Sequence, residues 1–446
     1  LLQSDIGPSW AFKLNEINKN KKADAAKAGK LAWQLHIDGL MKKIGEVDKF
    51  DHSVWRSVAA LADEQNNPGK FTAFIGYEWT SSDTHRVVIF KDNADKTGQI
   101  LPFSRYNSDN PEDLWAFFEN YQTVTGGDVL AIPHNANLSN GKTFFPSNFN
   151  GQPLGKAYAE TRSRWEPLIE VTQIKGDSET HPILSPDDEF ADYETWSVTD
   201  ISMEDGIDFG AKNNDKEEPI KRKYEYARSA LKLGLQHRDK LGVNPFKFGM
   251  IGSTDAHTSL ATADENNFWG KTSRDDPSIS RMFDPFLPGI KKPRTWQAAA
   301  AGYAAVWAEE NTREGLFTAI RRKEVYATTG PRITVRFFGG WDYMPDDAFR
   351  SNLASIGYKK GVPMGGDLTS APKGKTPSFL IRAVKDPDGA NLDRVQVIKG
   401  WHDKNGKLHE KIYNVALSDG RKENWKGKVK PVGNTVDVAN ASYFNS

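Results

Sequence analysis

Four short apolar runs recur along the first part of the chain, and each leads into residues that can bind a metal ion or transfer a proton. The runs are residues 71–77 before Glu78, 128–133 before His134, 168–169 before Glu170, and 246–252 before the segment that contains Asp255 and His257. They are nearly continuous rather than alternating, which is typical of parallel strands buried on both faces. Residues 23–44, 111–121 and 224–240 have helical character. We therefore expect an α/β chain.

Alternating strands and helices, with reactive residues at the C-terminal ends of the strands, are the organisation of a (β/α) barrel. We predict that the barrel occupies residues 1–331. After Pro331 the chain contains strand-like stretches separated by turn signals. Among these, Asn405-Gly406 predicts a two-residue turn between strands at 395–402 and 408–415. Residues 332–446 are therefore predicted to form a smaller β-rich, sandwich-like module.

The chain contains no cysteine in 446 residues, and this narrows its chemistry. Disulfides, thiolate ligands, iron–sulfur clusters and a cysteine nucleophile are all excluded, so a metal would have to be held by His, Asp and Glu. Patterns for a P-loop, a dinucleotide-binding fold and a nucleophile elbow are also missing in a suitable context. Because a cysteine-free chain suits an exported bacterial protein, we expect a periplasmic or secreted location.

The charge balance limits the class of partner. Lys and Arg together number 59, as do Asp and Glu, so the formal net charge is zero and no basic excess favours nucleic acid. No apolar run approaches the roughly 18 residues that a membrane span requires, so no span is expected. A small molecule bound by specific side chains is the partner that these observations favour.

The motif Asp255-Ala256-His257 is the sharpest local feature. Two ligand-type side chains at positions i and i+2, just after a buried strand, can face the same side and share a metal ion. A helix-capping Asp followed by an ordinary loop His is the alternative.

Glu78 and His85 form a second pair, because a carboxylate can bridge two metals and a hairpin would return His85 to it. A buried ion pair and a loop His are the alternatives for this pair.

Three further positions complete the candidate site. His134 ends the second apolar run and suits a metal ligand, although a core histidine is the competing interpretation. Asn135 beside it can position His134 or a substrate. Lys175 and Arg86 are cations that can hold an anionic substrate, with a solvated loop and a surface ion pair as their alternatives. Because barrel chemistry collects at one face, the convergence of these motifs favours a common site.

These motifs, in this order, resemble the polymerase and histidinol phosphatase (PHP) superfamily of metal-dependent phosphoesterases. The stretches that resemble most closely its branch catalogued as domain of unknown function 3604 are Gly76-Tyr-Glu-Trp-Thr-Ser81, Ala131-Ile-Pro-His-Asn135, Gly252-Ser-Thr-Asp-Ala-His257 and Tyr326-Ala-Thr-Thr-Gly-Pro331. The resemblance covers nearly the whole chain. It implies a distorted (β/α)7 barrel with a di- or trinuclear site of Zn, Mn or Fe. It matches Glu78 and His85 to the family's Glu and His pair, His134 to its later His, and Asp255 and His257 to its closing Asp-x-His.

The two motifs that open the family's pattern do not occur in this chain. The family begins with a His-x-His strand and then an Asp-His strand. No His-x-His occurs here, and the single Asp-His dipeptide, Asp51-His52, lies in a stretch with helical character. We therefore expect the first barrel strands, and part of the metal shell, to belong to a missing or separate N-terminal segment.

The resulting hypothesis is a metal-dependent hydrolase that cleaves a small anionic phosphoester at the C-terminal mouth of the barrel. Its predicted catalytic residues are Glu78, His134 and Asp255; its metal ligands are Glu78, His85, His134, Asp255 and His257; and its substrate-binding residues are Arg86, Lys175 and Asn135. Two alternatives stay open. One is a glycosidase barrel that uses Glu78 and Glu170 as its acid and nucleophile, and the other is a non-catalytic protein that holds a glycan or a protein partner.

Overall fold

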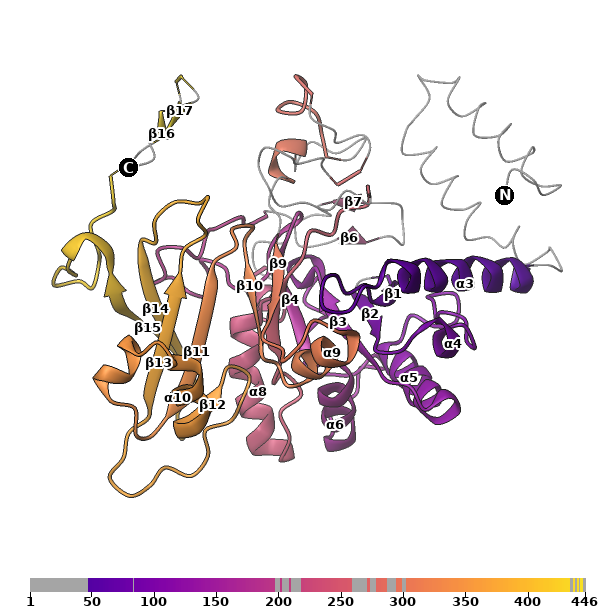
Figure 1. The fold of residues 1–446 in the computed structure, drawn as a ribbon, viewed down its shortest axis with the longest axis horizontal. Helices are drawn as coiled ribbons and strands as arrows, with labels where there is room; N and C mark the ends of the chain where they lie inside the picture. The colour runs from indigo at the N-terminus through magenta and orange to yellow at the C-terminus, as the bar shows by residue number, and fades with distance from the viewer. Residues whose placement is uncertain are drawn as a thin grey trace.

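The predicted α/β class is confirmed, with strands and helices interleaved up to β10 and strands predominating after it (Figure 1). The computed structural model describes residues 47–82, 84–196, 201–202, 208–209, 218–258, 271–272, 278–286, 294–298, 302–433, 436–437, 439–440 and 442–443. None of the helices in these ranges is long and apolar enough to cross a lipid bilayer.

The helices are α3 (Val47–Gln65), α4 (Ala94–Thr97), α5 (Pro111–Thr125), α6 (Lys156–Trp165), α7 (Glu218–Arg222), α8 (Ala227–Leu241), α9 (Arg313–Arg321) and α10 (Leu353–Lys360). The strands are β1 (Ile75–Thr80), β2 (His85–Phe90), β3 (Val129–His134), β4 (Leu168–Gln173), β5 (Gly176–Asp177), β6 (Ile201–Ser202), β7 (Asp208–Phe209), β8 (Gly249–Gly252), β9 (Tyr303–Val306), β10 (Val325–Thr328), β11 (Thr334–Gly340), β12 (Gly361–Pro363), β13 (Ser378–Val384), β14 (Arg394–His402), β15 (Leu408–Leu417), β16 (Val436–Asp437) and β17 (Ser442–Tyr443).

The described strands form seven small sheets, and none of these closes into a barrel. β1, β2 and β3 form an antiparallel sheet in that order, whereas β4 pairs in parallel with β8. β9 and β10 form a separate antiparallel pair. The prediction of parallel strands is therefore right for β4 and β8, but β1 and β3 are separated by the antiparallel β2. The closed barrel that the sequence predicted is not confirmed.

Apolar packing holds the separate sheets together where hydrogen-bonded ladders do not. One buried cluster contains Leu130, Ile132, Leu168, Ile251, Phe317, Ile320 and Val325, from β3, β4, β8, α9 and β10. In this cluster β3 lies beside β4, and β8 lies beside β10. Because removing apolar surface from water is not directional, such a cluster can align strands that share no ladder. The packing brings the ends of β1, β3 and β8 to one region of the molecule.

The predicted helices are confirmed where the structure describes them. The helix expected at 111–121 is α5: the Asn110 side chain accepts a hydrogen bond from the Glu112 N–H at 3.0 Å, and the proline at its first position has no N–H to leave unpaired. The helix expected at 224–240 is α8, and Asp51-His52 lies within α3, as expected. The helical stretch expected at 23–44 lies outside the described residues.

The residues after Pro331 are rich in strands, as predicted, while a module boundary at this residue stays a prediction. β11 pairs with β12 and β13, and β14 pairs with β15. The predicted hairpin is present, but the two-residue turn is wrong, since five residues, 403–407, connect its strands. The side chain of Asp403 accepts hydrogen bonds from the N–H groups of Asn405 and Lys407 at 2.9 and 3.0 Å, which stabilises the wider turn.

Candidate metal centre

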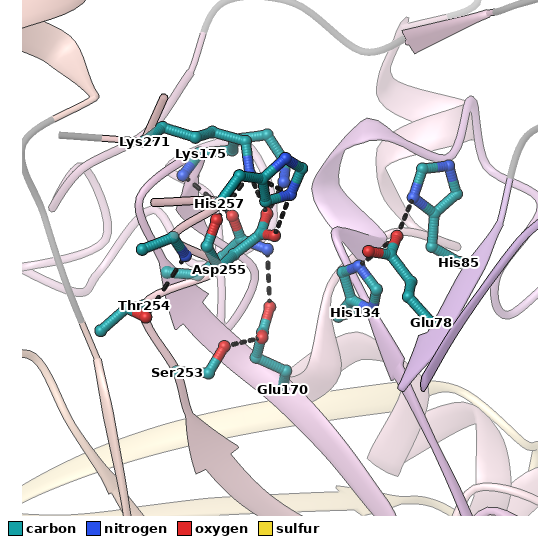
Figure 2. Close-up of polar contacts among 12 residues, drawn as sticks. Glu78, His85, His134, Glu170, Lys175, Ser253, Thr254, Asp255, His257 and Lys271 are labelled. Atoms are coloured by element: carbon teal, nitrogen blue, oxygen red, sulfur yellow. Dashed lines mark hydrogen bonds and ion pairs between the residues drawn. The ribbon is translucent and has the colours of Figure 1, made fainter. Parts of the chain in front are cut away.

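Glu78, His85 and His134 form the first group of potential ligands. The Glu78 Oε1 atom lies 2.9 Å from His85 Nδ1 and 3.2 Å from His134 Nε2. The two imidazole rings meet edge to face, with 5.5 Å between their centroids. In addition, the Thr80 hydroxyl donates a hydrogen bond to the same Glu78 oxygen at 3.0 Å. Figure 2 shows the three ligand-type side chains pointing toward one another.

The antiparallel register of β1, β2 and β3 explains this grouping. Thr80 lies opposite His85, and His85 lies opposite His134. Glu78 precedes Thr80 by two residues, so both side chains lie on the same face of the strand. Ligand-type residues from three strands therefore share one face of the sheet. The hairpin that the sequence suggested for His85 is the element that produces this arrangement.

Asp255 and His257 form the other side of the site, and Glu78 belongs to this group as well. The ligand atoms of Glu78, Asp255 and His257 all lie within 4.8 Å of one another, as do those of Glu78, His85 and His134. Asp255 Oδ1 lies 3.2 Å from His257 Nε2. Imidazole nitrogens and carboxylate oxygens suit Zn, Mn and Fe ions. The structure thus brings all five predicted metal ligands together, with one carboxylate common to both groups.

The local backbone places Asp255 and His257 at the end of β8. Gly252 ends this strand where a side chain would collide, since a Cβ atom there would lie 2.9 Å from the Thr328 carbonyl oxygen and 3.0 Å from Thr172 Cγ2. The close approach packs β8 between its neighbours. Asp255 then adopts a left-handed conformation with φ of 51°, which Asp tolerates better than most residues. The chain turns there and directs both ligands into the site.

Two lysines surround the carboxylate of Asp255. The ammonium groups of Lys175 and Lys271 both contact Asp255 Oδ2, the latter at 2.9 Å. Lys271 Nζ also lies 3.1 Å from His257 Nε2. Burial, reinforced by the positive charge of Lys271, lowers the pKa of Lys175 well below its usual value. The structure therefore places the predicted Lys175 in the site, with Lys271 beside it.

The electrostatics of the site favour the protonation states that bind metals. Burial alone would raise the pKa of Glu78, but hydrogen bonds and charges from His134 and His85 hold that pKa well below its usual range. Burial lowers the pKa of His85, against the opposing effect of Glu78. Burial and the charges of Lys271 and Lys175 lower the pKa of His257 to about 4. At neutral pH Glu78 is therefore ionised, and His85 and His257 are neutral, as metal ligation requires.

Asn135 lies directly beside this group and has an unusual environment. Its side chain is buried, and neither its amide nitrogen nor its amide oxygen has a hydrogen-bond partner among the described residues. Its backbone is left-handed, with φ of 54°. A buried amide without partners costs free energy, about 1–3 kcal/mol for each unsatisfied group. Such a group is suited to binding a polar ligand that enters the site.

The structure does not bring Arg86 to the site. Its guanidinium lies in the core, where the Nε atom is 2.6 Å from Glu166 Oε1. The Cζ atom of Arg86 lies 5.4 Å from the centroid of the Trp79 ring. Neighbouring residues of a strand point to opposite faces, so His85 and Arg86 cannot both face the ligands. Arg86 is a core ion-pair residue and not the phosphate clamp that the sequence suggested.

Glu170 lies near the site but is engaged within the protein. It lies inside β4 rather than at its end, and its side chain is 3% exposed. One carboxylate oxygen accepts a hydrogen bond from Gln173 Nε2 at 2.9 Å, and the other accepts one from the Ser253 hydroxyl. Figure 2 shows Glu170 beside Ser253, below Asp255 and His257 in this view. Its oxygens are thus held by neighbours rather than presented to a substrate.

Sequence reasoning missed Lys271, Ser253 and Thr80. Ser253 and Thr80 lie two residues along the sequence from the predicted ligands Asp255 and Glu78. This closeness in sequence could have identified them. Lys271 follows no apolar run, and only the fold brings it to Asp255. No pattern in the sequence distinguishes it from the other lysines.

Comparison with known families identifies the family of this chain. No curated protein and no solved structure matches this chain. A family described as a protein of unknown function, DUF3604, matches residues 3–446. The chain therefore belongs to the DUF3604 family.

Proposed function

We propose that this chain is a metal-dependent hydrolase of phosphoesters, built around a di- or trinuclear centre that contains Glu78. The observation that carries the proposal is that Glu78 belongs to both ligand groups. A shared carboxylate is suited to bridging two ions, and paired ions about 3.5–4 Å apart are a common arrangement in phosphatases and nucleases. The resemblance of the motifs to the PHP superfamily, with its barrel mouth as the reaction site, supports the same chemistry.

Each side of the centre has its own ligands. His85 and His134 would hold one ion and Asp255 and His257 another, with Glu78 common to both. Zn, Mn and Fe suit this set of nitrogen and oxygen donors. Such ions, when bound, supply Lewis acidity and lower the pKa of water from 15.7 to about 7, which makes a nucleophile available at neutral pH.

The surrounding residues of the chain would bind and orient the substrate. The amino groups of Lys175 and Lys271 lie beside Asp255 and can donate hydrogen bonds to an anionic ester. The unpaired amide of Asn135 can donate to an ester oxygen or accept from a hydroxyl group. Thr80 holds Glu78 in place through its 3.0 Å hydrogen bond. These residues position the substrate at the ligand cluster.

The glycosidase alternative receives no support from Glu170, because both oxygens of this buried carboxylate accept hydrogen bonds from Gln173 and Ser253. A glycosidase acid or nucleophile must reach the sugar. Only a turnover assay distinguishes the non-catalytic alternative from a hydrolase.

Metal analysis of the purified full chain, followed by turnover assays, tests the proposal. The substrates are p-nitrophenyl phosphate and bis(p-nitrophenyl) phosphate, each with and without EDTA, and p-nitrophenyl glycosides are the comparison. We expect bound Zn, Mn or Fe, and phosphoester turnover that EDTA abolishes and one of these metals restores. Glycoside turnover that survives EDTA would contradict the proposal, as would bound metal without turnover of any ester.

We also propose a periplasmic or secreted location, because a chain without cysteine suits an oxidising compartment. Fractionation of expressing cells tests this, with a cytoplasmic enzyme as the marker. Recovery with the cytoplasmic marker would contradict it.

A further inference from the structure

Among the described residues, the hairpin of β14 and β15 packs one face against α8, and the lysines of its other face are exposed. Glu410 points to α8, where its Oε2 lies 2.8 Å from Lys232 Nζ, and the stem of Lys232 lies against Gly400. Side chains at alternating positions of the hairpin point the other way. The Lys–aromatic face consists of these outward side chains: Lys399, Trp401, His409, Lys411 and Tyr413.

Cross-strand pairs organise this face. Lys399 lies opposite Lys411, and Trp401 lies opposite His409. The rings of Trp401 and His409 stack, with 5.2 Å between centroids and 17° between planes, which fixes the indole on the sheet. Lys399 and Lys411 are exposed, and Tyr413 is 39% exposed. The face thus presents two ammonium groups and the Tyr413 ring to solvent, with the half-buried Trp401 ring beside them.

Each of these two rings is paired with a lysine. Lys399 Nζ lies 5.0 Å from the centroid of the Trp401 ring, and Lys411 Nζ lies 4.8 Å from that of Tyr413. Cation–π contacts at exposed sites are weak, and the lysine stem is flexible, so the ammonium can leave the ring. A ligand can then stack on the ring while the displaced ammonium binds a negative group on that ligand.

A turn beside β15 repeats this pairing. Trp425 is 88% exposed, and Lys426 Nζ lies 4.8 Å from its ring centroid. The Glu423 side chain accepts a hydrogen bond from the Asn414 side chain of β15 at 2.7 Å, which anchors the turn to the hairpin. The turn therefore adds another exposed aromatic–lysine pair next to β15.

The charge of this part of the chain is also uneven. Residues 332–446 contain 19 Lys and Arg against 12 Asp and Glu, although the whole chain has as many acids as bases. Residues 1–331 therefore carry the compensating acidic excess. A local basic surface on a neutral chain attracts an anionic ligand to one end of the molecule.

We propose that the Lys–aromatic face binds an anionic polysaccharide, with sugar rings stacked on Trp401 and Tyr413 and its carboxylate or sulfate groups bound by Lys399 and Lys411. Sugars offer the flat apolar faces that suit exposed aromatic rings. A nucleic acid fits less well, because the face presents lysine and no arginine, whose planar fork suits phosphate.

Affinity electrophoresis of the full chain tests this proposal with four polymers: alginate, dextran sulfate, neutral dextran and a single-stranded oligodeoxynucleotide. There are two test variants, each with two substitutions. One combines Trp401→Ala with Tyr413→Ala, and the other combines Lys399→Ser with Lys411→Ser. The matched controls are Phe349→Ala, which removes an aromatic ring that is 87% exposed, and Lys359→Ser with Lys373→Ser, which removes two exposed lysines of the same region.

We expect alginate, dextran sulfate or both to retard the chain and neutral dextran not to do so. Each test pair should weaken that binding by about tenfold or more, and the controls should leave it unchanged. Alginate and dextran sulfate in separate lanes distinguish carboxylate from sulfate groups. Circular dichroism spectra equal to those of the unaltered chain establish that the variants are folded.

Three results would overturn the proposal. The first is equal loss of binding in the control variants, which would indicate a general charge effect. The second is tighter binding of the oligodeoxynucleotide, lost in the same test pairs. The third is self-association in light scattering that Lys399→Ser with Lys411→Ser abolishes, which would make a second copy the occupant. Phosphoester turnover, measured in the same samples, tests the hydrolase proposal. The hydrolase proposal and the polysaccharide proposal can therefore fail independently.

Discussion

His134 Nε2 lies 3.2 Å from Glu78 Oε1, although β3 and β1 are not neighbours in their sheet. The intervening strand, β2, begins at His85, whose Nδ1 atom lies 2.9 Å from the same oxygen. One carboxylate oxygen therefore faces two imidazole rings from two different strands. The Glu78 carboxylate also lies within reach of Asp255 and His257. The site thus converges on Glu78.

The variant Glu78→Gln should lose metal from both sides of the site. An amide keeps the shape of the side chain but removes the negative charge that both ligand groups share. Metal content per chain, measured by mass spectrometry after dialysis, should fall for all bound ions, and phosphoester turnover should fall by about 100-fold or more. Glu64→Gln, an exposed change on α3, is the control. Full metal content in Glu78→Gln would refute the bridging role.

The variant His257→Ala should abolish metal-dependent turnover while leaving the fold intact. Its side chain is 54% exposed, so truncation creates little buried cavity. His402→Ala is the matched control, because His402 also faces an aspartate, with Nε2 3.1 Å from Asp239 Oδ2, but lies far along the chain on β14. Metal content, turnover and thermal midpoint are measured for both variants. Unchanged turnover in His257→Ala would remove this residue from the ligand set.

The variant Glu166→Ala should destabilise the protein by about 3–5 kcal/mol, because it leaves buried positive charges without their partner. Glu166 faces Arg86 at 2.6 Å and Arg162 at 3.1 Å, and all three side chains are at most 4% exposed. Glu160→Ala is the control, since its carboxylate is 54% exposed and 3.7 Å from Lys156, and such pairs contribute about 1 kcal/mol or less. Urea unfolding measures both. A loss in Glu166→Ala no larger than the control's would show that Arg86 is not held by this pair.

The variant Asp177→Asn should stabilise the protein at neutral pH. Burial and then the charge of Glu179 raise the pKa of Asp177 well above its usual value, although Arg228 opposes this. The asparagine oxygen can still accept the Glu179 N–H, which is 2.8 Å from the present carboxylate.

The pH dependence of this effect has a definite sign. A raised pKa means that the folded chain binds the proton more tightly, so the unaltered protein loses stability as pH rises from about 3.9 through the raised pKa. The advantage of Asp177→Asn should therefore be small at about pH 4 and larger at about pH 8. Urea midpoints at both pH values measure it, with the exposed change Asp187→Asn as the control. An equal advantage at both pH values would contradict the raised pKa.

Much of the site could be predicted from short motifs. Asp255-x-His257 and the pair of Glu78 and His85 were visible because ligand spacing depends only on local backbone geometry, two residues along a loop or a return across a hairpin. The helix at α5 was visible for a similar reason, since its Asn110 cap and first-turn proline act within one turn. The metal itself and the phosphoester activity stay predictions.

Other features could not be predicted because they depend on partners distant in the chain. Arg86 looked like an anion clamp beside His85, but the alternation of β2 directs it to Glu166, which is 80 residues away. Glu170 was expected at a strand end and lies inside β4, because its pairing with β8 extends the strand. The turn at 403–407 is wider than Asn405-Gly406 suggested, since Asp403 caps a longer loop.

The sequence by itself determined the α/β class, the principal helices and the five ligand-type residues, because periodicity, capping and spacing are local properties of the chain. Only the tertiary structure decided that β2 separates β1 from β3, that no closed barrel forms among the described strands, and that Lys271 joins Lys175 at Asp255. These outcomes arise from apolar packing, which is not directional and draws together segments that no local pattern relates.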